Sequence, residues 1–507
     1  MIKKNLIANY LGQGWTVLMS IAFVPVYIKY LGMESYGLIG LFALLQSFLV
    51  LLDLGMSPTL GREMARFTGG SHSNESILDL LRSIEIIAVA IAVVIAGGIA
   101  LSADWIATDW LRAETLSTEV VSKAFVILGL VTALRFVENI YRSTLVGLQR
   151  QVLLNVVNGL MATLRSIGAI GILVWVAPTI GAFFLWQALV SITTLAILGI
   201  ATYRCFPKGE RSGRFSVDAL KSVLRFAGGM MGVTLLALLL TQVDKVLLSK
   251  LLTLSEYGLY TLAATVAGGL YMLVGPITQA YYPKFCQFVA QGNTAALATN
   301  YHQGAQLVSI VVGSAAIVLF FFAETLLRLW VHDAELAERV APFMSVLSLG
   351  TLLNALMWIP YQTQLAYGWT RLAIWSNVVA VAVFVPAILW IVPQYGSMGA
   401  AWIWVILNAG YCLISVQFMY QRILTKEKWH WYGGDVVVPL AASLLTAKVV
   451  QWLWPVVWQG GISDLALLVV AAFATLSAAT LASSEIRKPL FNLLKSRLMG
   501  QSNAHGN

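Results

Sequence analysis

The sequence predicts an all-α polytopic membrane protein of about fourteen transmembrane helices, built as two six-helix lobes followed by two extra C-terminal helices. Three observations support this fold class. Hydrophobic residues make up 59% of the 507-residue chain and charged residues only 11%, which leaves too little polar surface for a water-soluble domain. Apolar runs of about 20 residues, the length that spans a bilayer, alternate with short polar breaks. Finally, one sequence pattern occurs twice, almost half a chain apart.

The repeated pattern is KYLGMESYGL at residues 29–38, which returns as KLLTLSEYGL at residues 250–259. The offset, 250 − 29 = 221, also carries Gly147 onto Gly368. Matches that lie so far apart and share one spacing indicate an internal duplication. In a hydrophobic chain, such a duplication is typical of a transporter with two similar lobes.

The apolar runs place the spans in order along the chain. In the first lobe they predict spans at residues 6–30, 36–60, 83–103, 120–147, 152–176 and 179–202. In the second lobe they predict spans at 223–249, 256–282, 303–324, 338–366, 372–393 and 397–421, and two unrepeated spans follow at 435–457 and 463–483. The first run is too long for a signal peptide and has no small-residue cleavage site, so we expect it to stay in the mature protein.

These spans divide the chain into five parts. The parts are an N-terminal lobe (1–203), a polar interlobe segment (204–222), a C-terminal lobe (223–421), a pair of extra helices (422–484) and a tail (485–507). Six spans in each copy mean that both copies enter the membrane from the same side. The copies should therefore be related by an axis along the membrane normal, with a site between them near the midplane.

The formal net charge of +9 is spread so that basic and acidic loops alternate. The basic side includes Lys3, Lys4, Arg62, Arg66, Arg82, Arg150, Arg204, Lys208, Arg211, Arg214, Lys221, Lys284, Arg371, Arg422, Lys426, Lys428, Arg487, Lys488, Lys495 and Arg497. By the positive-inside rule, both termini are cytoplasmic. The charge thus predicts a topology and no nucleic-acid partner, although a basic tail that touches anionic membrane lipid remains a second interpretation.

Cysteines and histidines give no sign of a cofactor. The three cysteines are far apart, and the five histidines are scattered with no ligand pair at helical spacing. The sequence therefore predicts no disulfide framework, no metal site and no cofactor.

The polar breaks between spans are at most about twenty residues long, too short to form a folded domain outside the membrane. This argues against a membrane-embedded enzyme of envelope-glycan synthesis, which would hold catalytic carboxylates in a larger loop. Segment 104–119 contains Trp105 and Trp110 among acidic residues and predicts an interfacial helix. Aromatic anchoring and sugar binding are both open as its role.

Charged side chains within the spans are the candidate site. Arg135, Glu138 and Arg142 occur at i, i+3 and i+7 in the fourth span, so they share one helix face. Arg165 lies in the fifth span and Lys245 in the seventh. An ionised group at the bilayer centre costs about 2.5–3.5 kcal/mol, so each needs a partner or a function. Arginine matches phosphate oxygens in a bidentate geometry, which predicts a cationic cavity for an anionic solute or headgroup.

The intramembrane acids allow a competing interpretation, in which they simply neutralise these cations. Glu138, Asp244 and Asp53 lie within spans, and Lys448 adds a further cation to the thirteenth span. Five cations less three anions leave a surplus of two, so neutralisation is not a complete account. Asp53 opens the string DLGMSPTLGREMAR, where a structural role, as a cap or as a partner of Arg62 or Arg66, and an ion-coupling role are both open. Glu138 and Asp244 are the other candidates for coupling to a proton or sodium ion.

Three segments carry a resemblance to a known family: YLGMESYGL, DLGMSPTLGREMAR and QVDKVLLSKLLTLSEYGLYTLA (residues 242–263). Together they resemble the polysaccharide transporter branch of the multidrug/oligosaccharidyl-lipid/polysaccharide exporter (MOP) superfamily, and more narrowly a Wzx-type O-antigen or capsule repeat-unit flippase. The similarity covers essentially the whole chain.

The resemblance implies a V-shaped transporter of the bacterial inner membrane that is not an enzyme. Its substrate would be an undecaprenyl-diphosphate-linked oligosaccharide, moved from the cytoplasmic to the periplasmic leaflet by alternating access, with a polysaccharide polymerase and a chain-length regulator as partners. Arg135, Arg142, Arg165 and Lys245 correspond in kind to the cationic lumen of the family. Related peptidoglycan-precursor flippases have essential cations in the first span, which here offers only Asn9 and Gln13, and this argues against a peptidoglycan role. A multidrug extruder of the same superfamily remains an alternative, although cationic drugs need an acidic or aromatic cavity.

Overall fold

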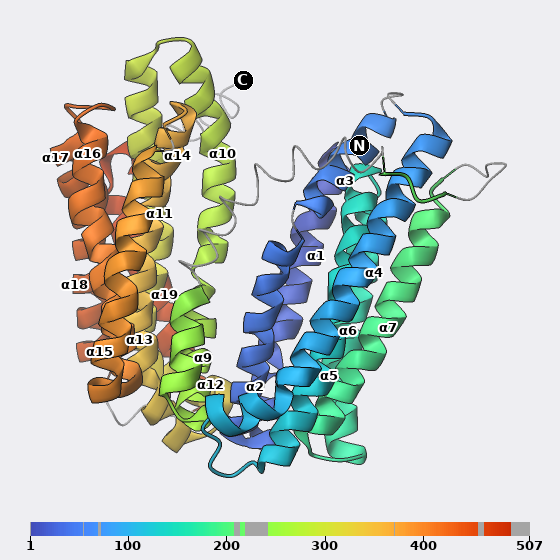
Figure 1. Ribbon diagram of the computed structural model, residues 1–507. Coiled ribbons are helices and arrows are strands. Elements are labelled where there is room, and N and C mark those ends of the chain that lie inside the picture. Colours follow the sequence, from blue (N-terminus) through green and yellow to red (C-terminus); the bar gives the residue numbers. More distant parts are fainter. Residues whose placement is uncertain are drawn as a thin grey trace, which may run out of the picture. The chain divides into compact units, whose positions relative to one another are not determined.

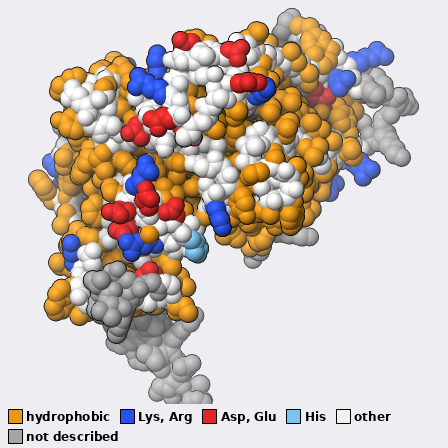
Figure 2. All heavy atoms as spheres, turned by 90° about the horizontal axis from the view of Figure 1, so that it is seen from below, with side chains coloured by type: hydrophobic (Ala, Val, Ile, Leu, Met, Phe, Trp, Pro, Cys, Tyr) orange, Lys and Arg blue, Asp and Glu red, His pale blue; other side chains and the backbone are white. Residues whose placement is uncertain are grey.

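The computed structural model describes residues 2–53, 55–68, 72–206, 213–217, 242–369, 371–454 and 461–487 (Figure 1). In this part of the chain the secondary structure is helical apart from one isolated bridge between Arg112 and Thr253. Among the described residues, eleven helical segments are long and apolar enough to cross a membrane. Hydrophobic side chains cover most of the surface seen in Figure 2. The prediction of an all-α, multi-span membrane protein is therefore confirmed.

The eleven segments do not correspond one to one with the roughly fourteen predicted spans. The spans predicted at 372–393 and 397–421 lie within one continuous segment, Arg371–Tyr420. That segment is broken at Gly396, whose φ of 58° interrupts the helix. Most of the span predicted at 223–249 falls outside the described residues.

By its contacts the chain divides into two compact units, residues 1–258 and 259–507. The second copy of the repeated pattern, up to Gly258, thus belongs to the first unit. The predicted lobe boundary at 204–222 stays a prediction, because residues 207–212 and 218–222 lie outside the described part.

The first unit consists of long helices that run side by side in Figure 1. They are α1 (Ile2–Ala22), α2 (Val24–Leu52), α3 (Met56–Thr68), α4 (Asn74–Trp105), η1 (Ile106–Trp110), α5 (Thr118–Gly147), α6 (Gln151–Trp175) and α7 (Ile180–Tyr203). Ser73, Ser117 and Thr179 begin α4, α5 and α7 by accepting a hydrogen bond from a backbone N–H of the first turn. Helix α5 is central, because it packs against α3, α4 and α7.

Two glycines set the path of the chain at the start of this unit. Gly32, with φ 80°, breaks α2 between the first two predicted spans, and Gly55, with φ 75°, separates α2 from α3. These dihedrals favour glycine over residues that carry a Cβ. The second span was predicted to run to residue 60, which is wrong, since the helix ends at Leu52 and α3 is a separate amphipathic helix.

Segment 104–119 also differs from the prediction of an interfacial helix. Residues 106–110 continue α4 as a short π-helix, and residues 111–117 are irregular apart from the bridge at Arg112. The rings of Trp105 and Trp110 pack with centroids 5.5 Å apart. The backbone N–H groups of residues 114–116 donate to Glu34, about 80 positions earlier, and local propensity cannot reveal such distant partners.

The second unit is built around α11. Its elements are the remainder of α9 (Leu254–Gly268), α10 (Tyr271–Ala290), α11 (Thr294–Phe321), α12 (Ala323–Val331), α13 (Ala334–Leu356), α14 (Trp358–Ala366), α15 (Arg371–Gly410), η2 (Tyr411–Ser415), α16 (Val416–Tyr420), α17 (Lys428–His430), η3 (Trp431–Val437), α18 (Val438–Leu453) and α19 (Ile462–Ala482). Helix α11 packs against α10, α13, α18 and α19. The two unrepeated spans thus correspond to α18 and α19, which join the core of this unit.

Candidate functional site: an arginine cluster on α5 and α6

The predicted charges of the fourth and fifth spans come together on α5 and α6. We call Arg135, Glu138, Arg142 and Arg165 the arginine cluster. The first three project from one face of α5, as their spacing predicts, and Arg165 lies on α6. Arg135 interacts electrostatically with the charges of the other three members of the cluster.

Arg142 is the member with a clear counter-charge. Its Nη2 donates to Glu138 Oε2 at 3.3 Å, and its Nη1 donates to Asn158 Oδ1 of α6 at 2.5 Å. The Glu138 side chain is 2% exposed, whereas that of Arg142 is 30% exposed. Glu138 thus partly neutralises Arg142 and holds it between the two helices.

Arg135 is held mainly by an aromatic ring. Its guanidinium carbon lies 4.7 Å from the ring centroid of Phe42 on α2, a cation–π distance. Its buried Nε atom has no hydrogen-bond partner among the described residues.

Arg165 has the most unsatisfied hydrogen-bonding capacity of the cluster. Its Nε and Nη2 atoms are both buried and have no partner in the described part of the chain. Nearby, the hydroxyl of Tyr27 donates to the backbone carbonyl of Ser166 at 3.4 Å. Leaving a buried charged donor unpaired costs more than the usual 1–3 kcal/mol of an unpaired polar group. Arg135 and Arg165 therefore offer donors that an anion or water would satisfy.

The neutralisation interpretation accounts for only part of this cluster. Three arginines face one carboxylate, so the cluster keeps a surplus of two positive charges. The second carboxylate oxygen of Glu138, Oε1, is also buried without a partner among the described residues.

Asp53 caps a helix. Its carboxylate accepts hydrogen bonds from the backbone N–H of Ser57 at 3.1 and 3.2 Å and from the Ser57 hydroxyl at 2.5 Å, at the start of α3. Asn139 of α5 donates to the same hydroxyl at 3.0 Å. Arg66, one suggested partner of Asp53, pairs instead with Glu63 at 3.1 Å. These contacts support the capping interpretation, and an ion-coupling role for Asp53 stays a prediction.

Lys245 and Asp244 lie in a helical stretch at residues 242–251. The Lys245 ammonium donates to Gln242 Oε1 at 3.1 Å, and Asp244 Oδ1 is buried with no partner among the described residues. Within the described ranges, no hydrogen bond or ion pair joins these two residues to the arginine cluster. Their membership of one site stays a prediction.

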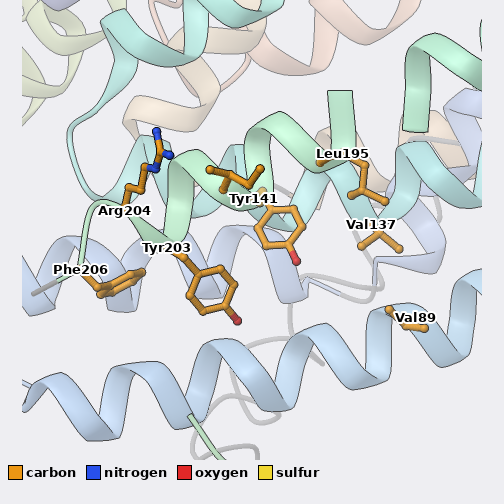
Figure 3. A pocket seen from close by; sticks show the side chains of 10 residues that line it. Val89, Val137, Tyr141, Leu195, Tyr203, Arg204 and Phe206 are labelled. Atoms are coloured by element: carbon orange, nitrogen blue, oxygen red, sulfur yellow. The ribbon is translucent and has the colours of Figure 1, made fainter. Parts of the chain in front are cut away.

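A separate cavity of about 790 Å³ lies beside α4, α5 and α7 (Figure 3). Val137 and Tyr141 line it from a face of α5 about 130° away from Arg135 and Arg142, as follows from helical periodicity. Its lining is mostly apolar, and the Tyr203 hydroxyl donates to the Glu85 carboxylate at 2.8 Å. This cavity does not contain the arginine cluster.

The sequence did not indicate the residues that surround the arginines. Phe42, Tyr27 and Asn158 come from other helices and have no distinctive spacing relative to Arg135 or Arg165. Asn158 carried the one available signal, a polar side chain within a predicted span.

Comparisons with known proteins agree with this fold. Residues 2–289 match the family model described as "Polysaccharide biosynthesis protein". A curated Shigella flexneri protein named "Putative O-antigen transporter" is 20% identical over 426 residues, covering 83% of this chain and 98% of the relative.

Two solved structures share the fold at low identity. An inward-facing multidrug resistance MATE family transporter of the MOP superfamily has a TM-score of 0.66 and 14% identity, covering 82% of this chain and 96% of the other. The lipid II flippase MurJ, in an inward closed conformation, also has a TM-score of 0.66, with 12% identity and coverage of 94% and 98%.

The fold is therefore that of a multi-span helical transporter of the MATE and MurJ type. The chain belongs to the polysaccharide biosynthesis protein family. The resemblance drawn from the sequence segments is thus confirmed at the level of the family.

Proposed function

We propose that the protein is a flippase for undecaprenyl-diphosphate-linked oligosaccharide repeat units, used in the synthesis of O-antigen, capsule or exopolysaccharide. The observation that carries the proposal is a set of buried guanidinium nitrogens, Nε of Arg135 and Nε and Nη2 of Arg165, that have no hydrogen-bond partner among the described residues, in a cluster with two excess positive charges. The family membership and the "O-antigen transporter" name of the relative support a lipid-linked glycan as substrate.

The proposed substrate fits the chemistry of the cluster. A diphosphate carries about two negative charges, which would balance the surplus, and its oxygens accept paired hydrogen bonds from guanidinium groups. The polyprenyl tail would stay in the lipid, so only the headgroup needs the cationic site. A cationic drug would be repelled by the same cluster, which argues against a multidrug extruder.

The proposed transport step is alternating access between the two leaflets of the bacterial inner membrane, with both termini in the cytoplasm. An inside-negative membrane potential favours outward movement of negative charge by about 2.3 kcal/mol per charge per 100 mV. Export of a diphosphate is therefore favoured, and a counter-ion would reset the carrier. Glu138 and Asp244 each have a carboxylate oxygen without a partner among the described residues and are the proposed coupling groups.

Substitution of the unsatisfied arginines tests the proposal. In a strain that lacks its own copy of the gene, Arg135→Ala and Arg165→Ala should abolish surface polysaccharide, because each removes donors for the headgroup. Arg328→Ala is the matched control, since Arg328 pairs with Glu324 on the half-exposed surface of α12. Membrane fractionation checks that each variant is inserted. Normal polysaccharide in both cluster variants would remove these arginines from the site.

The coupling role has its own test. Glu138→Gln and Asp244→Asn should slow flipping of the lipid-linked oligosaccharide in proteoliposomes that carry an ion gradient. Flipping rates that match those of the unaltered protein in both variants would show that these acids do not couple an ion.

A further inference from the structure

Four histidine and carboxylate side chains meet in the second unit, between α11 and the segment Glu427–Asp435. His302 lies on α11, His430 on α17 and Asp435 on η3. His302 Nε2 is 3.1 Å from Glu427 Oε2, and the ring centroid of His430 is 4.2 Å from that of His302. One donor atom from each of His302, Glu427 and His430 lies within 4.8 Å of the other two.

We propose that His302, Glu427 and His430 bind a divalent transition-metal ion, with Asp435 as the residue that positions His302. Two imidazoles and one carboxylate form a donor set that suits Zn²⁺ and its neighbours, whereas Mg²⁺ and Ca²⁺ prefer oxygen ligands. The fourth coordination position would take water. This site is independent of the arginine cluster, so it goes beyond the proposed transport function.

The buried half of the site is already oriented as metal sites require. His302 Nδ1 donates to Asp435 Oδ2 at 2.5 Å, which leaves Nε2 free to face Glu427. Gln306 donates to the other Asp435 oxygen at 2.9 Å, and Gln306 Oε1 accepts from the backbone N–H of Glu485 at 2.9 Å. Metal-binding histidines are commonly fixed by a carboxylate in this way. Asp435 is fully buried and His302 is 5% exposed, so this geometry is held by the core.

The exposed half of the site can close around an ion. Tetrahedral zinc with bonds of about 2.0–2.1 Å places neighbouring donor atoms about 3.3 Å apart, close to the 3.1 Å between His302 and Glu427. The His430 ring stacks on His302 with an interplanar angle of 25°, so it must turn to point a nitrogen at the same ion. Its side chain is 44% exposed, which leaves room for that rotation.

The same four residues without a metal would form a network of hydrogen bonds and ion pairs, and the two cases differ in a measurable property. Only a metal site gives saturable, stoichiometric binding that depends on His430. The sequence offers no ligand pair at helical spacing here, because His302 lies more than 120 positions before Glu427.

The test is titration of Co²⁺ into the full-length protein in detergent, after chelator treatment and purification through a tag without histidines. We expect one Co²⁺ per chain with the visible absorption of four-coordinate cobalt, displaced by Zn²⁺. His430→Ala and Glu427→Gln should each weaken binding by more than about 100-fold, and Asp435→Asn by about 10–100-fold, the range known for partners of metal ligands. His332→Asn, at a histidine that directly follows α12, should leave binding unchanged.

Two outcomes would overturn the proposal. One is the lack of saturable Co²⁺ binding by the unaltered protein. The other is equal affinity in the unaltered protein, His430→Ala and Glu427→Gln, which would assign any bound cobalt to another place. Both key variants change partly exposed side chains, so loss of folding should not obscure the result; thermal unfolding of the metal-free proteins verifies this.

Discussion

The two copies of the repeated pattern touch each other inside the first unit, and they do so reciprocally. A Cβ on Gly37 would lie 2.6 Å from the Leu254 carbonyl oxygen, and a Cβ on Gly258 would lie 2.6 Å from the Met33 carbonyl oxygen. Gly37 and Gly258 are equivalent positions at the offset of 221, as are Met33 and Leu254. The contact is therefore symmetric, as expected of two copies related by a twofold axis.

The acidic residues of the two copies behave differently. Glu34, 6% exposed, accepts hydrogen bonds from the backbone N–H groups of Glu114, Thr115 and Leu116 and from the Thr115 hydroxyl, at 2.6–3.1 Å. Glu256 accepts instead from the backbone N–H of Thr253 at 3.3 Å, while the Thr253 hydroxyl accepts from the Glu256 N–H at 3.2 Å. This second arrangement is a capping box within one helix.

The loop held by Glu34 also reaches the second copy. The backbone N–H of Leu254 donates to the Arg112 carbonyl at 2.9 Å, and Trp110 Nε1 donates to the Ser249 hydroxyl at 3.1 Å. Residues 110–116 thus connect both copies, although only the first copy supplies a carboxylate to them. The comparison teaches that the contact between the two copies is symmetric, whereas the attachment of the loop to them is not.

The largest expected effect comes from the symmetric contact. Gly37→Ala and Gly258→Ala should each lower the free energy of unfolding by about 3 kcal/mol, because the new methyl group meets a backbone oxygen that cannot rotate away. Thermal unfolding in detergent measures this. Equal losses in the two variants are expected, and a large loss in only one would break the symmetry of the comparison.

Helical glycines with open space around them serve as controls for these substitutions. At Gly97 and Gly98 of α4, a Cβ would meet no atom of another described element within 4 Å. Alanine there should be neutral or stabilising by up to about 1 kcal/mol, from its better helix propensity. Destabilisation of a similar size at Gly97 would show that glycine is needed for a reason other than the contact.

The second-largest expected effect on stability should distinguish Glu34 from Glu256. Glu34→Ala leaves three backbone N–H groups and one hydroxyl without their acceptor and should cost about 2 kcal/mol. Glu256→Ala removes one half of a capping box and should cost about 1 kcal/mol or less. Chemical denaturation of both variants in one detergent makes the comparison direct. Equal costs would mean that the loop contributes no more stability than a helix cap.

The smallest expected effect on stability should come from the contact between Lys250 and Trp110, at the edge of loop 110–116. The Lys250 ammonium lies 4.8 Å from the ring centroid of Trp110, and removal of an exposed cation–π contact costs about 0.5–1 kcal/mol. Lys250→Met should therefore lower the melting temperature slightly. Lys29→Met, at the equivalent position of the first copy, is the matched control. An equal decrease in both variants would show that the Trp110 contact is not the cause.

The sequence predicted features that depend on periodicity and length. Helical spacing correctly placed Arg135, Glu138 and Arg142 on one face of α5, and apolar length located α18 and α19. Features that depend on partners distant in the chain were not predictable. Three such contacts join residues about 80 to 130 positions apart. Glu34 binds loop 114–116, Phe42 packs on Arg135, and His430 lies beside His302.

The break at Gly32 falls between the first two predicted spans, whereas the helix boundary near Gly55 was predicted imprecisely, for a physical reason. Gly55 adopts a positive φ that separates two helices inside the predicted span 36–60, and hydropathy does not register such a break. In the DLGMSPTLGREMAR string, the Asp53 cap and Gly55 together start a new helix where the sequence suggested the end of a longer one.

The mutual approach of Gly37 and Gly258 gives a physical reason for the similarity of the two copies of the pattern. Where a segment packs against its own counterpart, a larger side chain in either copy meets the main chain of the other, so neither position can drift alone. The similarity of KYLGMESYGL and KLLTLSEYGL thus follows from a contact in which each copy must fit against the backbone of the other.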